Sequence, residues 1–263
     1  KPEEKAARFG LVGAAFGIGF VLGPLIGGLL GELGTRAPFY AAAALAATNM
    51  VFGFFVLPET VTDRIRRPFE MHRANPFGAF RHLGALPGIG RLTVIFFIYQ
   101  VAFFVYPAIW AYFAQERFGW ESGMIGVSLA SFGVSIAVTQ GLLIRPVLAR
   151  FGERKTVLIG LALNGAGFLA MSLVTSGAVA LMLTPLTALG AIAMPALQGI
   201  MSRRVPDDSQ GELQGLLTSA GALAMIISPV LMTQTFYLFA SEGASPYLPG
   251  APFVLSLVLI AVC

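Results

Sequence analysis

The sequence predicts an all-α integral membrane protein, and three observations support this fold class. Of the 263 residues, 56% are hydrophobic and only 11% are charged, and the mean hydropathy is +0.79. The apolar residues gather in charge-free runs of roughly 20, the length that a helix needs to cross a hydrocarbon core about 30 Å thick. Basic residues are concentrated in alternate connecting segments. Together these observations exclude a water-soluble domain.

Seven charge-free runs are long enough to cross a bilayer. We expect membrane-spanning helices over residues 10–31, 37–57, 92–113, 122–144, 156–175, 177–200 and 213–240. An eighth apolar run begins near residue 251 and reaches the last residue after about 13 positions, which is too short to cross. We therefore expect a fragment whose one end is a cut helix and whose other end is a charged loop.

The positions of the basic residues predict the orientation. All but two of the 17 Lys and Arg residues lie before the first run, between the second and third, between the fourth and fifth, or between the sixth and seventh. The two exceptions are Arg36 and Arg117. The positive-inside rule places the Lys1 loop in the cytoplasm. The sequence pI of about 9.5 then reflects contact with anionic lipid headgroups, and no nucleic-acid partner is expected.

The longest polar segment predicts a division into bundles. Residues 58–91 are expected to form a cytoplasmic linker between two groups of helices. Residues 1–57 would then be the end of an amino-terminal bundle, with two spans. Residues 92–263 would be a carboxy-terminal bundle with five complete spans and a truncated one. The two histidines, His72 and His82, lie in the linker without partners at metal-ligand spacing, so we expect no metal site.

Glycines surround a proline within the first apolar run. Small residues let membrane helices approach closely, so we expect a packing face here. The face would be a close contact between the two bundles, a seal against ion leakage, or both. Its residues are Gly19, Gly23, Pro24, Gly27 and Gly28.

The pattern Gly19-x-x-x-Gly23-Pro24-x-x-Gly27-Gly28 resembles the antiporter signature in the fifth helix of the drug/proton antiporters of the major facilitator superfamily. Further stretches, in family order, resemble the tetracycline-efflux branch, among them residues 96–100, 149–154 and 194–198. The resemblance implies an incomplete major facilitator superfamily helical bundle. It would hold helices five to twelve of a twelve-helix transporter, with the last truncated and the first four absent.

The resemblance also implies a function. It implies a secondary active transporter of the bacterial inner membrane that exports tetracycline or a similar amphipathic drug by alternating access. The energy source would be the proton gradient, and no cofactor is implied. An uncoupled facilitator, a sensor or scaffold on the same fold, or a transporter of another substrate stays open. No enzymatic activity is expected, because no span carries a nucleophile with a base or a pair of carboxylates.

Ionisable groups are missing from the predicted spans. All 13 acidic residues fall in loops or at span edges, and an ionisable residue inside a membrane is functional by default. The resembled antiporters usually carry an acid in the ninth helix and often a histidine in the eighth. Matching their motifs onto this chain places Asn164 and Ile136 at those positions. We therefore expect the proton-coupling residues to lie in the amino-terminal half of the transporter, which this chain lacks. That half would be a partner of this chain.

Neutral polar residues inside the spans are the candidates for a substrate pathway. Amide side chains donate and accept hydrogen bonds, which suits a neutral or zwitterionic ligand. Hydrogen bonds between helices are the alternative for each of them and stay open. The candidates are Tyr99, Gln100, Gln140, Asn164 and Gln198.

A basic segment after the fourth run resembles the second copy of the superfamily's cytoplasmic loop motif, which locks helix ends together when the cytoplasmic side is shut. Ala149 occupies the place of the usual carboxylate, and Glu153 paired with Arg150 or Arg154 would replace it. Topology signalling by the basic residues alone is an equal alternative. The candidate cytoplasmic gate comprises Arg145, Arg150, Glu153 and Arg154.

Overall fold

The computed structural model describes residues 19, 21–56, 88–206, 209–241 and 243–263, and these residues contain helices and connections but no strand. The first helix, Val21–Leu33, is followed by α2 (Ala37–Val56). The later helices are α4 (Gly90–Phe103), α5 (Val105–Phe118), α6 (Ser122–Val138), α7 (Ile144–Leu173), α8 (Gly177–Leu189), α9 (Ala193–Arg203), α10 (Gln210–Ala240) and α11 (Ala251–Val262). Residues 58–87 of the predicted linker lie outside the described residues.

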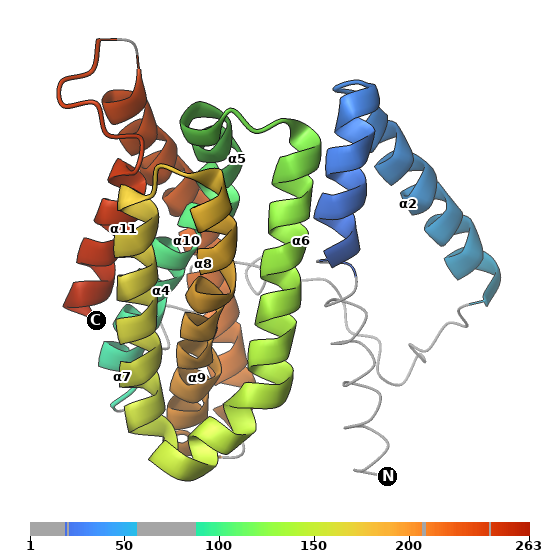
Figure 1. Cartoon of the computed structure of the whole chain (residues 1–263). Helices are drawn as coiled ribbons and strands as arrows, with labels where there is room; N and C mark the ends of the chain where they lie inside the picture. Colours follow the sequence, from blue (N-terminus) through green and yellow to red (C-terminus); the bar gives the residue numbers. More distant parts are fainter. Residues whose placement is uncertain (1–18, 20, 57–87, 207–208, 242) are drawn as a thin grey trace.

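Within the described part, five helical segments are long and apolar enough to cross a membrane. One of them, Ser122–Leu173, has 52 residues, far more than a single crossing needs. Gly152 interrupts it with φ 71° and ψ 168°, a backbone conformation that glycine adopts without strain. The chain turns back near this point, so that α6 and α7 run in opposite directions (Figure 1). The predicted all-α membrane class is thus confirmed, and Gly152 separates the predicted spans 122–144 and 156–175.

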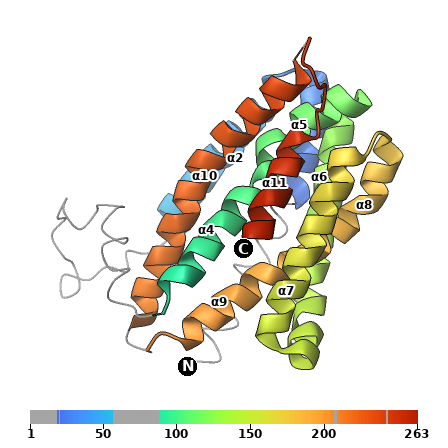
Figure 2. The same ribbon diagram turned by 90° about the vertical axis from the view of Figure 1, so that its left-hand side faces the viewer.

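Helices α4 to α11 pack into one bundle (Figures 1 and 2). In this bundle α10 packs against α4 and α5, α11 packs against α7 and α4, and α6 packs against α8. The helix Val21–Leu33 stands beside α6, and α2 lies on the far side of that helix (Figure 1). No residue of α2 is buried, although the helix is apolar on every side. Such a helix suits a surface that faces lipid or further protein. The division into two bundles with a linker stays a prediction.

Prolines interrupt three of the crossings. Pro107 has no N–H to offer the carbonyl of residue 103, and the first long segment of the bundle is interrupted at Phe104, between α4 and α5. A 3₁₀ turn, Gly190–Ile192, joins α8 to α9 just before Pro195. A π-helical turn, Thr139–Leu143, precedes Pro146. Each irregular turn leaves backbone groups that need another partner inside a membrane.

Two buried serines supply such partners at the break between α4 and α5. The hydroxyl of Ser228, on α10, donates to the carbonyl oxygen of Val101 at 2.8 Å. The hydroxyl of Ser256, on α11, donates to the carbonyl oxygen of Ala102 at 3.0 Å. Both serines are fully buried. The break is therefore held by α10 and α11, which is how membrane helices tolerate a proline.

Candidate functional site

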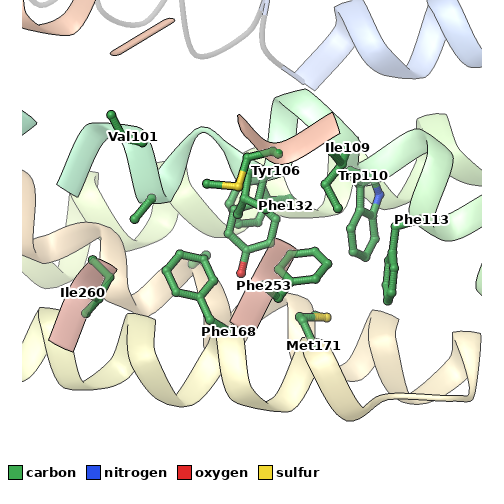
Figure 3. Close-up of a cluster of buried hydrophobic side chains, with 14 of the residues drawn as sticks. Val101, Tyr106, Ile109, Trp110, Phe113, Phe132, Phe168, Met171, Phe253 and Ile260 are labelled. Atoms are coloured by element: carbon green, nitrogen blue, oxygen red, sulfur yellow. The ribbon is translucent and has the colours of Figure 1, made fainter. Parts of the chain in front are cut away.

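Tyr106 of α5 lies at the centre of a buried aromatic cluster (Figure 3). Its ring centroid is 5.1 Å from that of Phe132 and 5.7 Å from those of Phe168 and Phe253. These rings come from α5, α6, α7 and α11. Because aromatic pairs at such distances attract one another beyond their buried area, the cluster fastens the four helices together.

A small cavity adjoins the aromatic cluster, between α5, α6, α7 and α8. The volume open to the centres of water molecules is about 20 Å³. This is room for roughly one water molecule, whereas a pocket for a drug-sized ligand measures about 300–1,000 Å³. The lining residues are Tyr106, Trp110, Ser128, Leu129, Phe132, Met171, Thr184 and Thr187.

Three hydroxyls of the cavity wall, those of Ser128, Thr184 and Thr187, are arranged as hydrogen-bond acceptors. The indole N–H of Trp110 donates to the Oγ of Ser128 at 2.8 Å, and that hydroxyl donates to the carbonyl oxygen of Ile125 at 2.7 Å. The hydroxyls of Thr184 and Thr187 likewise donate to carbonyls of their own helix. Their protons are committed, so their remaining lone pairs can accept bonds from a ligand or a water.

Asn164 ties three helical segments together. Its Nδ2 donates to the carbonyl oxygens of Gly190 at 2.8 Å and Gly160 at 3.0 Å, and the hydroxyl oxygen of Tyr99 lies 3.3 Å from the same nitrogen. Only 2% of Asn164 is exposed. A Cβ on Gly190 would lie 2.7 Å from this nitrogen, so the glycine makes the approach of the side chain feasible. Of the two interpretations of Asn164, the structure shows the bond between helices.

In the described part of the chain, no side-chain hydrogen bond joins the other pathway candidates to Asn164 or Tyr99. Gln100 is half-buried and lies 3.5 Å from the place of a Cβ on Gly221, whereas Gln140 and Gln198 are exposed. Within the described part of the chain, none of the three glutamines makes a side-chain hydrogen bond. Their amides are thus unused by the fold, and a substrate-binding role for them stays a prediction.

The glycine motif has two different faces. A Cβ on Gly28 would lie 2.8 Å from the Cα of Gly126 on α6, and a Cβ on Gly126 would lie 2.6 Å from the carbonyl oxygen of Pro24. The backbones of the two helices therefore touch here. At Gly19, Gly23 and Gly27, by contrast, an added Cβ would meet no atom of the described chain within 4 Å. A packing role for these three glycines stays a prediction.

The candidate gate has a different ion pair from the one that the sequence led us to expect. Glu153 pairs with Arg203, at the end of α9, and not with Arg150 or Arg154. The Glu153 carboxylate lies next to Gly199 of α9. A Cβ at Gly199 would lie 3.0 Å from Oε1 of Glu153, so the missing side chain leaves room for the ion pair between α7 and α9. Arg150 is exposed, with its guanidinium 5.8 Å from the centre of the Phe151 ring. Arg145 and Arg154 are also exposed.

The opposite end of the bundle is held by two polar contacts. The Nε of Arg117 donates to the carbonyl oxygen of Val174 at 3.1 Å. The hydroxyl of Tyr247 donates to Oε1 of Glu116 at 2.6 Å. The bond to this carboxylate raises the pKa of Tyr247, because it stabilises the protonated phenol. These contacts tie the end of α5 to the end of α7 and to the connection before α11.

Sequence reasoning missed the residues that depend on the pairing of distant helices. Trp110, Ser128, Thr184 and Thr187 line the cavity, but serines and threonines are common in membrane helices and gave no signal. Arg203 is one of the basic residues that predict the orientation, and nothing in the sequence indicates its partner on α7. For the cavity, the one available signal was the density of aromatic residues between positions 96 and 113.

No cluster of three or more His, Cys, Asp and Glu residues that could hold a metal occurs in the described part of the chain. His72 and His82 lie outside that part. The chemistry of the described interior is therefore that of amides, hydroxyls and aromatic rings.

Comparison with known proteins places this architecture in a family. The model of the Major Facilitator Superfamily matches residues 1–229. The tetracycline resistance protein, class C, of Escherichia coli is 38% identical over 261 residues, which are 99% of this chain and 64% of that protein. The class G protein of Vibrio anguillarum is 36% identical over 262 residues, which are 99% of this chain and 65% of that protein.

A third relative extends the pattern. The tetracycline resistance protein, class E, of Escherichia coli is 37% identical over 236 residues, which are 88% of this chain and 57% of that protein. The chain thus spans less than two thirds of the length of these relatives. Since the family model covers most of the sequence and the described residues form a bundle of apolar helices, the chain belongs to the Major Facilitator Superfamily.

Proposed function

We propose that the complete protein is a secondary active transporter that exports tetracycline, or a similar amphipathic drug, across the bacterial inner membrane by alternating access. The observation that carries the proposal is the similarity to tetracycline resistance proteins along 99% of this chain. The interior supports it, because aromatic walls and hydroxyl acceptors suit an amphipathic ligand. The cavity of about 20 Å³ has room for roughly one water molecule, so alternating access must widen it before a drug can pass.

The free energy for export would come from the proton gradient. The position at which the resembled antiporters carry an acid holds Asn164 here, and its amide is committed to bonds between helices. We infer that the proton is carried by residues of the complete protein outside this chain, in the helices that precede the glycine motif. No cofactor is needed for this mechanism.

The orientation follows from the basic residues. The charge distribution supports a cytoplasmic Lys1 loop and a cytoplasmic linker over residues 58–91. Arg36 and Arg117 would then face the opposite side. A membrane-impermeant maleimide applied to intact cells should label a cysteine placed at Arg36 or Arg117 and should not label one placed at Arg154.

The test of function is drug accumulation in bacterial cells. Cells that express the complete protein should accumulate less tetracycline than cells without it, and a protonophore should abolish the difference. If energised cells with the protein accumulate as much tetracycline as cells without it, drug export is contradicted.

One observation favours a second candidate. The described spans contain no buried acidic or basic side chain, so an uncoupled facilitator on the same fold needs no further residue. A facilitator would let tetracycline equilibrate with the medium, and the protonophore would then change nothing. The same accumulation assay separates the two.

A further inference from the structure

The contact between the helix Val21–Leu33 and α6 continues beyond the Gly28–Gly126 approach toward the ends of both helices. A Cβ on Gly31 would lie 3.1 Å from the Cβ of Ser122. One residue further along, the carboxylate of Glu32 lies directly against Gly123, so closely that a Cβ there would collide with it. The two helices therefore touch along a continuous line that ends at a charged group.

This charged group meets the amino terminus of α6. Ser122 and Gly123 are the first two residues of that helix, and the residue before them, Glu121, makes no side-chain hydrogen bond that caps its first turn. The N–H groups of a first turn lack partners within the helix and carry a partial positive charge, which attracts a carboxylate. Gly123 is buried against Glu32, while the carboxylate itself stays exposed. The contact joins an acid of one helix to the positive end of the other.

Of the charged residues near the amino terminus of α6, Glu32 is the acid that reaches this terminus from the other helix. Glu121 precedes α6 and carries its charge on the same helix, and Arg36 lies exposed in the connection to α2. When the helices separate, Glu121 keeps its place at the end of α6, whereas Glu32 moves away from it. Of the two acids at this end, only Glu32 therefore moves relative to the amino terminus of α6 when the helices separate.

We propose that Glu32 and Gly123 form a latch that holds the transporter shut on the side opposite to the cytoplasm, with Gly31 and Ser122 as the adjoining line of closure. This inference rests on the proposed function and orientation. The structure is then the conformation closed to the outside. For a drug to leave, the helix Val21–Leu33 and α6 must part at this end, and Glu32 must leave the amino terminus of α6.

Disulfide cross-linking tests the closure directly. The complete protein receives Gly31→Cys and Ser122→Cys, in a background with Cys263→Ser. Their Cβ atoms would lie close to the separation that a disulfide needs, about 3.5–4.5 Å. A protease site between α2 and α4 lets a gel report the bond, since the two fragments stay joined when it has formed. We expect the pair to cross-link on oxidation, tetracycline export to stop, and a reducing agent to restore export.

The control pair is Leu29→Cys with Ser122→Cys, because Leu29 lies on the same helix two residues before Gly31 and is 51% exposed. This pair should not cross-link and its export should survive oxidation. Failure of the Gly31/Ser122 pair to cross-link, or normal export by the cross-linked protein, would overturn the closure. If the reduced pair and the parent protein both fail to export tetracycline, the proposed function fails, while the cross-linking yields still decide whether the helices close here.

The latch itself is tested by the rate of cross-linking. Glu32→Gln should lower that rate roughly two- to fivefold, the size expected for one charge at a helix end. Glu121→Gln, the matched control, should not lower it. Added to the Gly31→Cys/Ser122→Cys protein, Gly123→Ala should lower the cross-linking rate, because the methyl group displaces the Glu32 carboxylate. In a protein that also carries Glu32→Ala, Gly123→Ala should have no further effect on the rate. An unchanged rate with Glu32→Gln would remove Glu32 from the latch.

Discussion

The Nδ2 of Asn164 lies 2.8 Å from the carbonyl oxygen of Gly190, and the glycine leaves the space that this approach requires. An alanine at Gly190 would place its Cβ 2.7 Å from the same nitrogen. The helix that carries Asn164 and the 3₁₀ turn before α9 are thus closely fitted to each other at this pair. This fit determines what either position tolerates.

Gly190→Ala should lower the free energy of unfolding by about 1–3 kcal/mol, because the added methyl group overpacks a buried contact. Thermal unfolding of the purified protein in detergent measures the loss. In an Asn164→Ala background, Gly190→Ala should lower the free energy of unfolding much less, because the side chain that overlaps with the added methyl group is absent. Equal losses in the two backgrounds would show that the fit does not control stability.

Asn164→Asp should also destabilise the protein, by about 1–3 kcal/mol, because a carboxylate cannot donate to the two carbonyl oxygens and would leave them without a partner. The side chain at this position acts as a hydrogen-bond donor, although the resembled antiporters usually carry an acid there. The matched control is Asn164→Ala, which removes the bonds without setting a new acceptor against the carbonyls and should cost less. An aspartate variant as stable as the parent would contradict the assigned bonds.

Ser228→Ala and Ser256→Ala should each lower stability by about 0.6–2 kcal/mol, because each leaves a carbonyl of the α4–α5 break without its bond in a nonpolar environment. Thr233→Ala is the control, since that hydroxyl donates to its own helix at Pro229 and joins no second helix. Thermal unfolding should rank both serine variants below the control. The reverse order would mean that α10 and α11 do not hold the break.

Arg203→Gln should weaken the protein by less than about 1 kcal/mol, because 69% of the arginine side chain is exposed and water screens the pair. The loss should vanish in a Glu153→Gln background and should shrink at high salt. Arg150→Gln and Arg154→Gln should show no coupling to Glu153. A measurable coupling between Glu153 and Arg154 would restore the partner that the sequence led us to expect.

The membrane spans could be predicted from the sequence because one physical requirement, about 20 apolar residues per crossing, acts on each segment by itself. Pro107 and Pro195 likewise interrupt their helices for local reasons. The partners of Asn164, Ser228 and Glu153 could not be predicted in this way. They depend on which faces of distant helices meet, and residues 101 and 228 become neighbours only through packing.

The same reasoning explains the partial success with the glycines. Their spacing predicted a close approach, and Gly28 makes one with α6, but the spacing alone cannot say which face meets a neighbour. Gly126, on the partner helix, sits in a segment rich in small residues and carried no mark of its role. Helix pairing, and hence the latch at Glu32, becomes visible only in three dimensions.

Uptake into proteoliposomes tests the central claim most directly. The complete protein is purified and reconstituted so that its cytoplasmic side faces outward, and a proton gradient, acid inside, is imposed. Proton-coupled export predicts that labelled tetracycline accumulates inside above its external concentration and that an ionophore which dissipates the gradient releases it. Entry only to equal concentrations, unchanged by the ionophore, would contradict a coupled drug transporter.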